Sequence, residues 1–132
     1  MGFSRNEFMP LAQRTPWMLS PPLAPDDGPI DLQQLQRVTL GDAGLTREVL
    51  EMFVTQAARL LRSLAKLPAE ASQLAHTLTG SARAIGACRV AGIASALELA
   101  IREGGDPTQV LRELDHAVTE ACTAIDAMLR NS

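Results

Sequence analysis

The stretch AHTLTGSARAIGA, residues 75–87, carries a histidine, a glycine and an arginine at spacings that suit one face of a helix. Gly80 follows His76 by four residues, although a glycine inside a helix costs on the order of 1 kcal/mol relative to alanine. The missing side chain leaves space beside the imidazole, where a second protein can bring a reactive group. A neutral, solvated imidazole is a competent nucleophile, and Arg83 can offset negative charge that develops on its partner. The stretch therefore predicts a nucleophilic histidine.

The helix that carries His76 is predicted to turn this residue toward solvent. At about 100° per residue, His76 lies roughly 160° from Leu74 and Leu78, which belong to the apolar stripe. The same wheel places a mostly polar set on the outward face, namely Ser72, Gln73, His76, Thr79, Gly80 and Arg83. A lone exposed histidine is equally typical of an ordinary surface residue, so the wheel alone leaves both interpretations open.

Helical signals fill the chain from residue 30 onward. Asp31, with Gln34 three residues later, forms a capping-box pattern that starts a short first helix. The GDAG sequence at residues 41–44 ends this helix. Apolar residues then recur at spacings of three and four over residues 45–67, which predicts a long second helix.

Three further helices are expected. Pro68 suits the first turn of the helix that carries the histidine, which is predicted to run to about residues 85–87. The following helix ends at the glycine pair 104–105, a strong C-terminal signal. Asp106 and Pro107 suit the N-cap and the first-turn proline of the last helix.

Four long amphipathic helices joined by short turns predict an all-α fold, an antiparallel up-and-down four-helix bundle with a short extra N-terminal helix. We expect the bundle over residues 30–132 and the short helix at one end of it. Residues 1–29 hold six of the eight prolines and are predicted to form a tail. The apolar side chains of this tail have three possible docking places: the domain, a partner or a second copy.

The composition argues against several classes of protein. The net charge of −3 argues against a general nucleic-acid binder. The sequence contains no run of about 18 apolar residues, so we expect no transmembrane helix. No apolar run of the signal-peptide type is present at the N-terminus. Cys88 and Cys122 are isolated and lack metal-ligand spacing, so we expect small buried thiols in a reducing compartment and no metal site.

The sequence HTLTGSARAIGA resembles the signature of histidine-containing phosphotransfer (HPt) domains, usually H-x-x-K-G-S-x-x-x-[apolar]-G. The matching positions are His76, Gly80, Ser81, Ile85 and Gly86. The helix that follows, with Glu98 in its ALELA segment, and the sequence upstream also look like parts of such a domain. The resemblance covers roughly residues 30–130 and omits the tail.

The resemblance implies a phosphorelay intermediate. Nε2 of His76 would accept a phosphoryl group from an aspartyl phosphate of a receiver domain and pass it to another receiver. The implied partners are receiver domains of a hybrid histidine kinase, of response regulators, or of both. Such a chain is a phosphocarrier without an ATP-binding or kinase domain, and it needs no cofactor of its own because Mg²⁺ is held by the receiver. The family also implies a bacterial, cytoplasmic protein, which we expect to be a monomer.

One position departs from the family pattern. The family usually has lysine three residues after the histidine, whereas this chain has Thr79. We hypothesise that Arg83, on the same predicted face, supplies the missing cation, because a guanidinium binds phosphate oxygens well. Thr79 also supports an alternative, a degenerate HPt-fold module that binds a receiver or other partner without phosphotransfer. A third possibility is a helical adaptor that acts through the apolar tail.

The remaining polar candidates are expected to be structural. His116 is predicted to be an ordinary surface histidine, and Glu98 a salt-bridge partner for Arg102 at i+4 rather than a site residue. Ser81 lies about 140° from His76, so it is expected to pack or to bond within the bundle. Gly86 is predicted to ease a bend or close packing near the helix end.

Overall fold

The computed structural model describes residues 28–131, and all of its regular elements are helices. They are α1 (Leu32–Thr39), α2 (Ala43–Ala65), α3 (Ala71–Ile85), α4 (Cys88–Arg102) and α5 (Thr108–Arg130). The predicted all-α class is therefore confirmed for the described part of the chain. Residues 1–27, which make up most of the predicted tail, lie outside the described residues.

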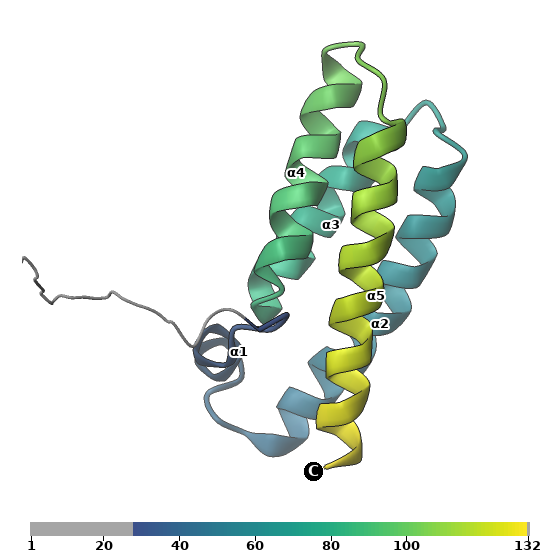
Figure 1. Cartoon of the computed structure of the whole chain (residues 1–132). Helices are drawn as coiled ribbons and strands as arrows, with labels where there is room; N and C mark the ends of the chain where they lie inside the picture. The colour runs from purple at the N-terminus through teal and green to yellow at the C-terminus, as the bar shows by residue number, and fades with distance from the viewer. Residues whose placement is uncertain (1–27, 132) are drawn as a thin grey trace, which may run out of the picture.

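The four long helices form a bundle in which each contacts two others. Helix α2 packs against α3 and α5, and α4 packs against the same two helices. Figure 1 shows the chain reversing direction at each connection between these helices. The short α1 lies at one end of the bundle and contacts α2 and α3, as the sequence predicts.

Aliphatic side chains from all four long helices make the core. Leu64, Leu78, Leu97 and Leu114, one from each long helix, are fully buried. Phe53 on α2 is the single aromatic residue among the described part of the chain, and it is buried with them. Removing such side chains from water stabilises the fold by about 25 cal/mol per Å² of apolar surface.

The predicted cap of α1 forms, but the capping box does not close. The Asp31 carboxylate accepts the backbone N–H groups of Gln33 and Gln34 at 3.1 and 3.4 Å. The Gln34 side chain turns away from Asp31 and donates to the carbonyl oxygen of Arg83 at 3.3 Å. Gln34 therefore joins α1 to the last turn of α3 instead of completing its own helix start.

Two prolines lie just outside the helices that they were expected to begin. Helix α3 starts at Ala71, and the carbonyl oxygen of Pro68 accepts the Ala71 N–H at 3.0 Å in the preceding turn. The chain reverses at Leu67, whose φ of 47° is incompatible with a helix starting there. Pro107 likewise precedes the first residue of α5 and takes the N-cap position predicted for Asp106. The Asp106 carboxylate, one residue earlier, still accepts the Thr108 N–H at 3.0 Å.

The α3–α4 connection is only two residues long, and it depends on Gly86. This glycine has a φ of +84°, and a Cβ on it would lie 2.5 Å from the carbonyl oxygen of Asp31. The Asp31 N–H donates to the Gly86 carbonyl at 2.7 Å. Gly86 thus permits close packing at the end of α3, as predicted, and Asp31 at the start of α1 is the residue that it accommodates.

The prediction of two buried thiols is wrong. Cys88 is exposed because it is the first residue of α4, on the side away from the core, and Cys122 on α5 is half-buried. Burial, and secondarily the nearby Asp126 carboxylate, raises the pKa of the Cys122 thiol. Within residues 28–131, no group of three or more histidine, cysteine or acidic residues is placed to hold a metal ion.

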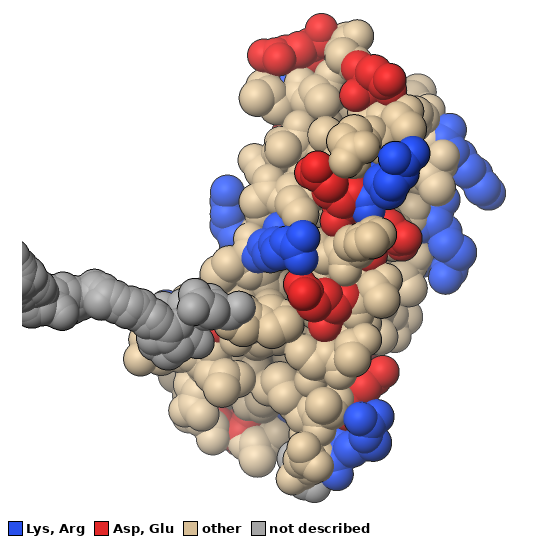
Figure 2. All heavy atoms as spheres, in the orientation of Figure 1, with Lys and Arg blue, Asp and Glu red and all other residues tan. Residues whose placement is uncertain are grey.

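The surface carries charges of both signs. On the face shown in Figure 2, lysine and arginine side chains alternate with acidic ones and do not merge into one basic area. None of the described helices is both long enough and apolar enough to cross a lipid bilayer.

Candidate functional site

His76 lies in the middle of α3 with its imidazole turned toward solvent. Its side chain is 76% exposed, which agrees with the outward orientation expected from the helical wheel. Its chain neighbour Ala75 belongs to the buried stripe and is fully enclosed. The ring is thus carried by a helix whose opposite side is fixed in the core.

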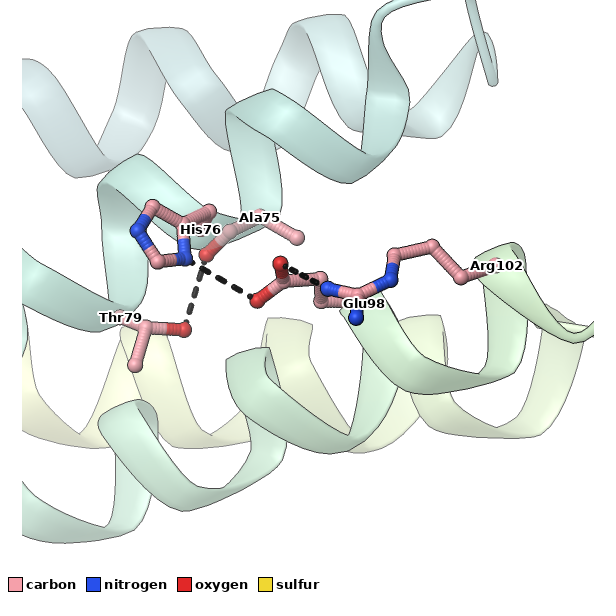
Figure 3. Close-up of polar contacts among 5 residues, drawn as sticks. All are labelled: Ala75, His76, Thr79, Glu98 and Arg102. Carbon is pink, nitrogen blue, oxygen red and sulfur yellow. Dashed lines mark hydrogen bonds and ion pairs between the residues drawn. The ribbon is translucent and has the colours of Figure 1, made fainter.

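One nitrogen of the imidazole is held by the neighbouring helix. Nδ1 of His76 lies 3.3 Å from Oε1 of Glu98 on α4 (Figure 3). An ionised carboxylate can only accept a hydrogen bond, so this contact requires the hydrogen to be on Nδ1. The other nitrogen, Nε2, then carries the free lone pair, and Figure 3 shows it on the side of the ring away from Glu98.

The second oxygen of the same carboxylate binds an arginine. Oε2 of Glu98 accepts a hydrogen bond from Nη1 of Arg102 at 2.8 Å, one turn later on α4. The Glu98 side chain is only 15% exposed, whereas Arg102 is largely exposed. Glu98 is therefore a largely enclosed carboxylate that connects the imidazole to a guanidinium.

These side chains line an open hollow of about 510 Å³ between α3 and α4. Its lining consists of Ser72, Gln73, His76, Thr77, Glu98 and Arg102. Of the residues predicted for the outward face, the structure brings Ser72 and Gln73 beside the histidine in this hollow. Thr77 and the two α4 residues were not among those candidates.

Gly80 leaves the backbone of α3 uncovered one turn after His76. A Cβ built on this glycine meets no atom within 4 Å, so the space above it is open. Ala84, one turn further, is exposed and small. The surface of α3 on the C-terminal side of His76 therefore carries no large side chain at these two positions, and a second molecule can approach the backbone there, as the sequence predicts.

Thr79 does not lie on this face, and the prediction that it does is wrong. Its side chain is 3% exposed, and its hydroxyl donates to the carbonyl oxygen of Ala75 at 2.9 Å (Figure 3). On the helical wheel Thr79 lies about 40° from Ala75 and about 60° from Ala82, which are both in the core stripe. Thr79 also lies about 60° from His76 on this wheel, so the angles alone do not distinguish the two faces. The packing of the helices places Thr79 in the core.

Arg83 is exposed at the C-terminal end of α3. Its guanidinium makes no hydrogen bond or ion pair with the other residues in the range 28–131, and it does not line the hollow. Its backbone carbonyl instead accepts the Gln34 side chain. The suggested role of Arg83 near a phosphoryl group therefore stays a prediction.

The other polar candidates are distributed as follows. His116 is exposed on α5, as expected of a surface residue. Ser81 is half-buried. The i+4 pair of Glu98 and Arg102 is confirmed, but Glu98 also contacts the histidine, which the sequence analysis did not predict.

Chemically, the arrangement provides one fixed nucleophile. The hydrogen on Nδ1 is oriented by a carboxylate, the lone pair on Nε2 is open to solvent, and positive charge that develops on the ring is balanced by Glu98. Such an imidazole can attack an electrophile brought by a second molecule.

Comparison with known proteins identifies a family. The family model described as "Hpt domain" matches residues 48–131, which include α3, α4 and α5. None of the curated proteins matches the chain. Because the model covers more than half of the residues, the chain belongs to the Hpt domain family, the phosphocarriers of histidine phosphorelays.

Proposed function

We propose that this chain is a phosphorelay intermediate in which His76 carries the phosphoryl group between two receiver domains. The observation that carries this proposal is the His76 ring itself, which is 76% exposed while its Nδ1 is held by Glu98. A rigid helix presents the nucleophilic atom, and a receiver supplies the electrophile. The donor is a receiver of a hybrid histidine kinase and the acceptor a response regulator, or the reverse.

The transfer step balances as follows. The lone pair of Nε2 attacks the phosphorus of an aspartyl phosphate, a new N–P bond forms, and the P–O bond to the aspartate breaks. The aspartate leaves as a carboxylate. The hydrogen stays on Nδ1, so the phosphorylated ring gains one positive charge, and the aspartate gains one negative charge because the electron pair of the broken P–O bond stays on its oxygen.

Glu98 stabilises the product of this step. Its carboxylate accepts the Nδ1 hydrogen and faces the positive charge that appears on the ring. A protonated imidazole is also a better leaving group than a neutral one when the phosphoryl group moves on. The same contact therefore assists transfer in both directions, which suits a carrier between two high-energy phosphates.

The receiver supplies most of the remaining chemistry. Phosphoryl transfer depends mainly on positioning and on charge stabilisation, and Mg²⁺ on the receiver provides the latter. This chain contributes the open backbone at Gly80, the polar side chains of Ser72 and Gln73, and the cation of Arg83 at the edge of the face. It acts as a monomer in a bacterial cytoplasm, without a cofactor of its own and without ATP.

A transient docking surface surrounds the imidazole. Gly80 and Ala84 on α3 are exposed and small, and Ser72 and Gln73 lie beside the imidazole in the hollow. Such apolar area with a polar rim is typical of weak, reversible interfaces. A carrier that must leave one receiver and reach another requires this kind of contact.

One observation favours a second candidate function. The position of the family lysine is occupied by Thr79, which is buried and uncharged. A chain without that cation could bind a receiver or another partner without accepting phosphate. This degenerate interaction module is the alternative that the experiment must separate from the carrier.

The test is to mix the protein with a phosphorylated receiver and follow the label. An N–P phosphohistidine is lost in acid and survives alkali, unlike phosphoserine or an acyl phosphate. We expect such a label on the wild-type chain and its loss in His76→Ala. His116→Ala is the matched control, because it removes the other exposed histidine, on α5, and should leave labelling unchanged.

The two functions give different results. Acid-labile label that disappears only with His76 supports the carrier. Binding of the receiver without any label, with binding weakened by Gly80→Leu, identifies the interaction module instead. Label that persists in His76→Ala would exclude the proposed site.

A further inference from the structure

A groove with mostly apolar walls lies between α1, the first turns of α2 and the last turn of α5. Figure 1 shows these three segments at the same end of the bundle. The groove measures about 250 Å³, and its lining includes Leu32, Leu50 and Met128. It continues along α1 into an open hollow of about 590 Å³, which shares Leu32 and is bounded by Leu40. We propose that this α1 groove, with its continuation, binds the segment WML at residues 17–19 of the same chain, which lies outside the described residues.

Two leucines at the α1 groove are exposed to water. Leu32 is 56% exposed and Leu40 is 89% exposed, the highest fraction of any large apolar side chain within residues 28–131. Leu40 also has a left-handed φ of 54°, a conformation that glycine and asparagine adopt at a lower cost. A bound segment would remove the apolar surface of both leucines from water. The exposure and the backbone conformation of Leu40 therefore both favour a groove that is occupied.

The chain itself carries an apolar segment that suits this groove. Residues 15–25 contain no charged side chain, and Trp17, Met18 and Leu19 follow one another within them. A tryptophan buries about 150–250 Å² of surface when it is enclosed, so it contributes strongly to an apolar contact. Prolines at positions 16, 21 and 22 restrict the backbone on both sides, so less conformational freedom is lost on binding.

The segment is joined to the bundle close to the α1 groove. Ile30 is buried, and the Asp31 N–H donates to the Gly86 carbonyl at 2.7 Å, so the chain that enters α1 is fixed against the bundle. The chain between Trp17 and Gly28 can span about 35 Å when it is extended. Helix α1, with its eight residues, is only about 12 Å long. The whole groove is therefore within reach of the segment.

Attachment to the same chain favours intramolecular binding over binding to a second copy. A short linker keeps the two sites at an effective concentration in the millimolar range, far above the micromolar concentrations at which copies meet in a purified sample. The entropic cost of closing such a loop also rises only slowly with its length. The occupant that we infer is therefore the segment of the same molecule.

The α1 groove is separate from the site at His76. Its lining and that of the hollow beside His76 have no residue in common. A segment bound in the groove would cover α1 and the adjacent ends of α2 and α5, and it would leave the imidazole open. The inference therefore does not depend on whether His76 carries a phosphoryl group.

The experiment uses the fluorescence of the full chain. Trp17 is its only tryptophan and it has no tyrosine, so the emission reports on this segment alone. Because a bound indole is shielded from water, we expect a blue-shifted emission maximum and slow quenching by acrylamide in the native protein. In urea the emission should shift to the red and quenching should become faster.

Two variants open the groove, and one serves as the matched control. Leu40→Asn removes an apolar side chain, and asparagine tolerates the left-handed φ, so the fold should not be weakened. Leu32→Gln removes a second apolar side chain from the groove. In each, the ratio of bound to free segment should fall about tenfold, as expected for one buried leucine, and the quenching constant should rise accordingly. Met52→Gln should leave quenching unchanged, because Met52 on α2 is 65% exposed but does not line the groove.

The outcomes are distinct once circular dichroism shows that each variant keeps its helices. Protection of Trp17 that is independent of protein concentration, is reduced by at least one groove variant and is kept in Met52→Gln supports the inference. A Trp17 that acrylamide reaches as easily in the native protein as in urea overturns it. Protection that increases with protein concentration also overturns it and identifies a second copy as the occupant. Protection that neither groove variant reduces, or that Met52→Gln reduces equally, overturns it as well, because the segment then binds elsewhere.

Discussion

Gly80 and Gly86 belong to one helix and its cap, but their surroundings are opposite. Around Gly80 nothing lies within 4 Å of an added Cβ, whereas at Gly86 such an atom would lie 2.5 Å from the Asp31 carbonyl. The first glycine keeps a surface open, and the second lets two backbones touch. The same residue type thus serves access in one place and rigidity in the other.

The rigid region determines the geometry of the open one. The two-residue connection at Gly86 and Ala87 fixes how α4 returns along α3, and α1 secures it through the Asp31 N–H. That register brings Glu98 to His76 across the two helices. Precise placement of the nucleophile therefore depends on a corner of the bundle that the receiver need not touch.

The largest effect is expected from Gly86→Ala. A non-glycine residue at a φ of +84° is strained, and its Cβ would push against the Asp31 backbone, which cannot yield as a flexible side chain would. The free energy of unfolding should fall by at least about 2 kcal/mol, as measured by urea denaturation.

Gly104→Ala is the matched control for that variant. Gly104 has a similar φ of +74°, but an added Cβ there meets nothing within 4 Å. Its cost should therefore be limited to backbone strain, about 1 kcal/mol. Equal losses in the two variants would show that crowding by Asp31 contributes nothing and that the contrast between the two glycines is only one of φ.

A substitution at the open glycine should act on transfer instead of stability. Gly80→Leu replaces a poor helix former with a good one in open space, so unfolding free energy should rise by up to about 1 kcal/mol. The added side chain occupies the approach to His76 and should slow transfer from a phosphorylated receiver about tenfold, corresponding to about 1.4 kcal/mol. Rates of labelling by phosphoramidate, a small donor, should change much less. An unaltered receiver rate would mean that the bare backbone has no role in docking.

Local signals in the sequence predicted most of the fold. Asp31 and the glycines at the helix ends act over a few residues, so their effects are visible without tertiary structure. The outward orientation of His76 follows from the helical period alone. These features are confirmed because nothing distant in the sequence competes with them.

The predictions that were wrong or incomplete for the site depended on packing between helices. Thr79 lies at the boundary between the two faces of α3, where a wheel cannot decide, and contact with the bundle buries it. The contact between His76 and Glu98 joins residues from two helices, so it requires the register that the α3–α4 corner sets. The sequence signal for these residues was the i+4 spacing of Glu98 and Arg102. This spacing predicted their ion pair, but it did not show that the pair lies beside His76.

The smallest effect is expected at the opposite corner, between α4 and α5, where the Asp106 carboxylate binds the first residue of α5. Hydrogen bonds from the Thr108 backbone N–H, and then from its hydroxyl, lower the pKa of the Asp106 carboxyl. The stability that this carboxylate contributes is present above the unfolded pKa of about 3.9, and it is lost as pH falls through the lower folded value. Asp106→Asn keeps an acceptor for the Thr108 N–H but removes the charge, so its Tm should lie slightly below that of the wild type at pH 7 and approach it as the pH falls below the folded pKa. A Tm difference that is constant across this range would show that the charge of Asp106 does not stabilise the corner, and that this residue acts there through hydrogen bonding alone.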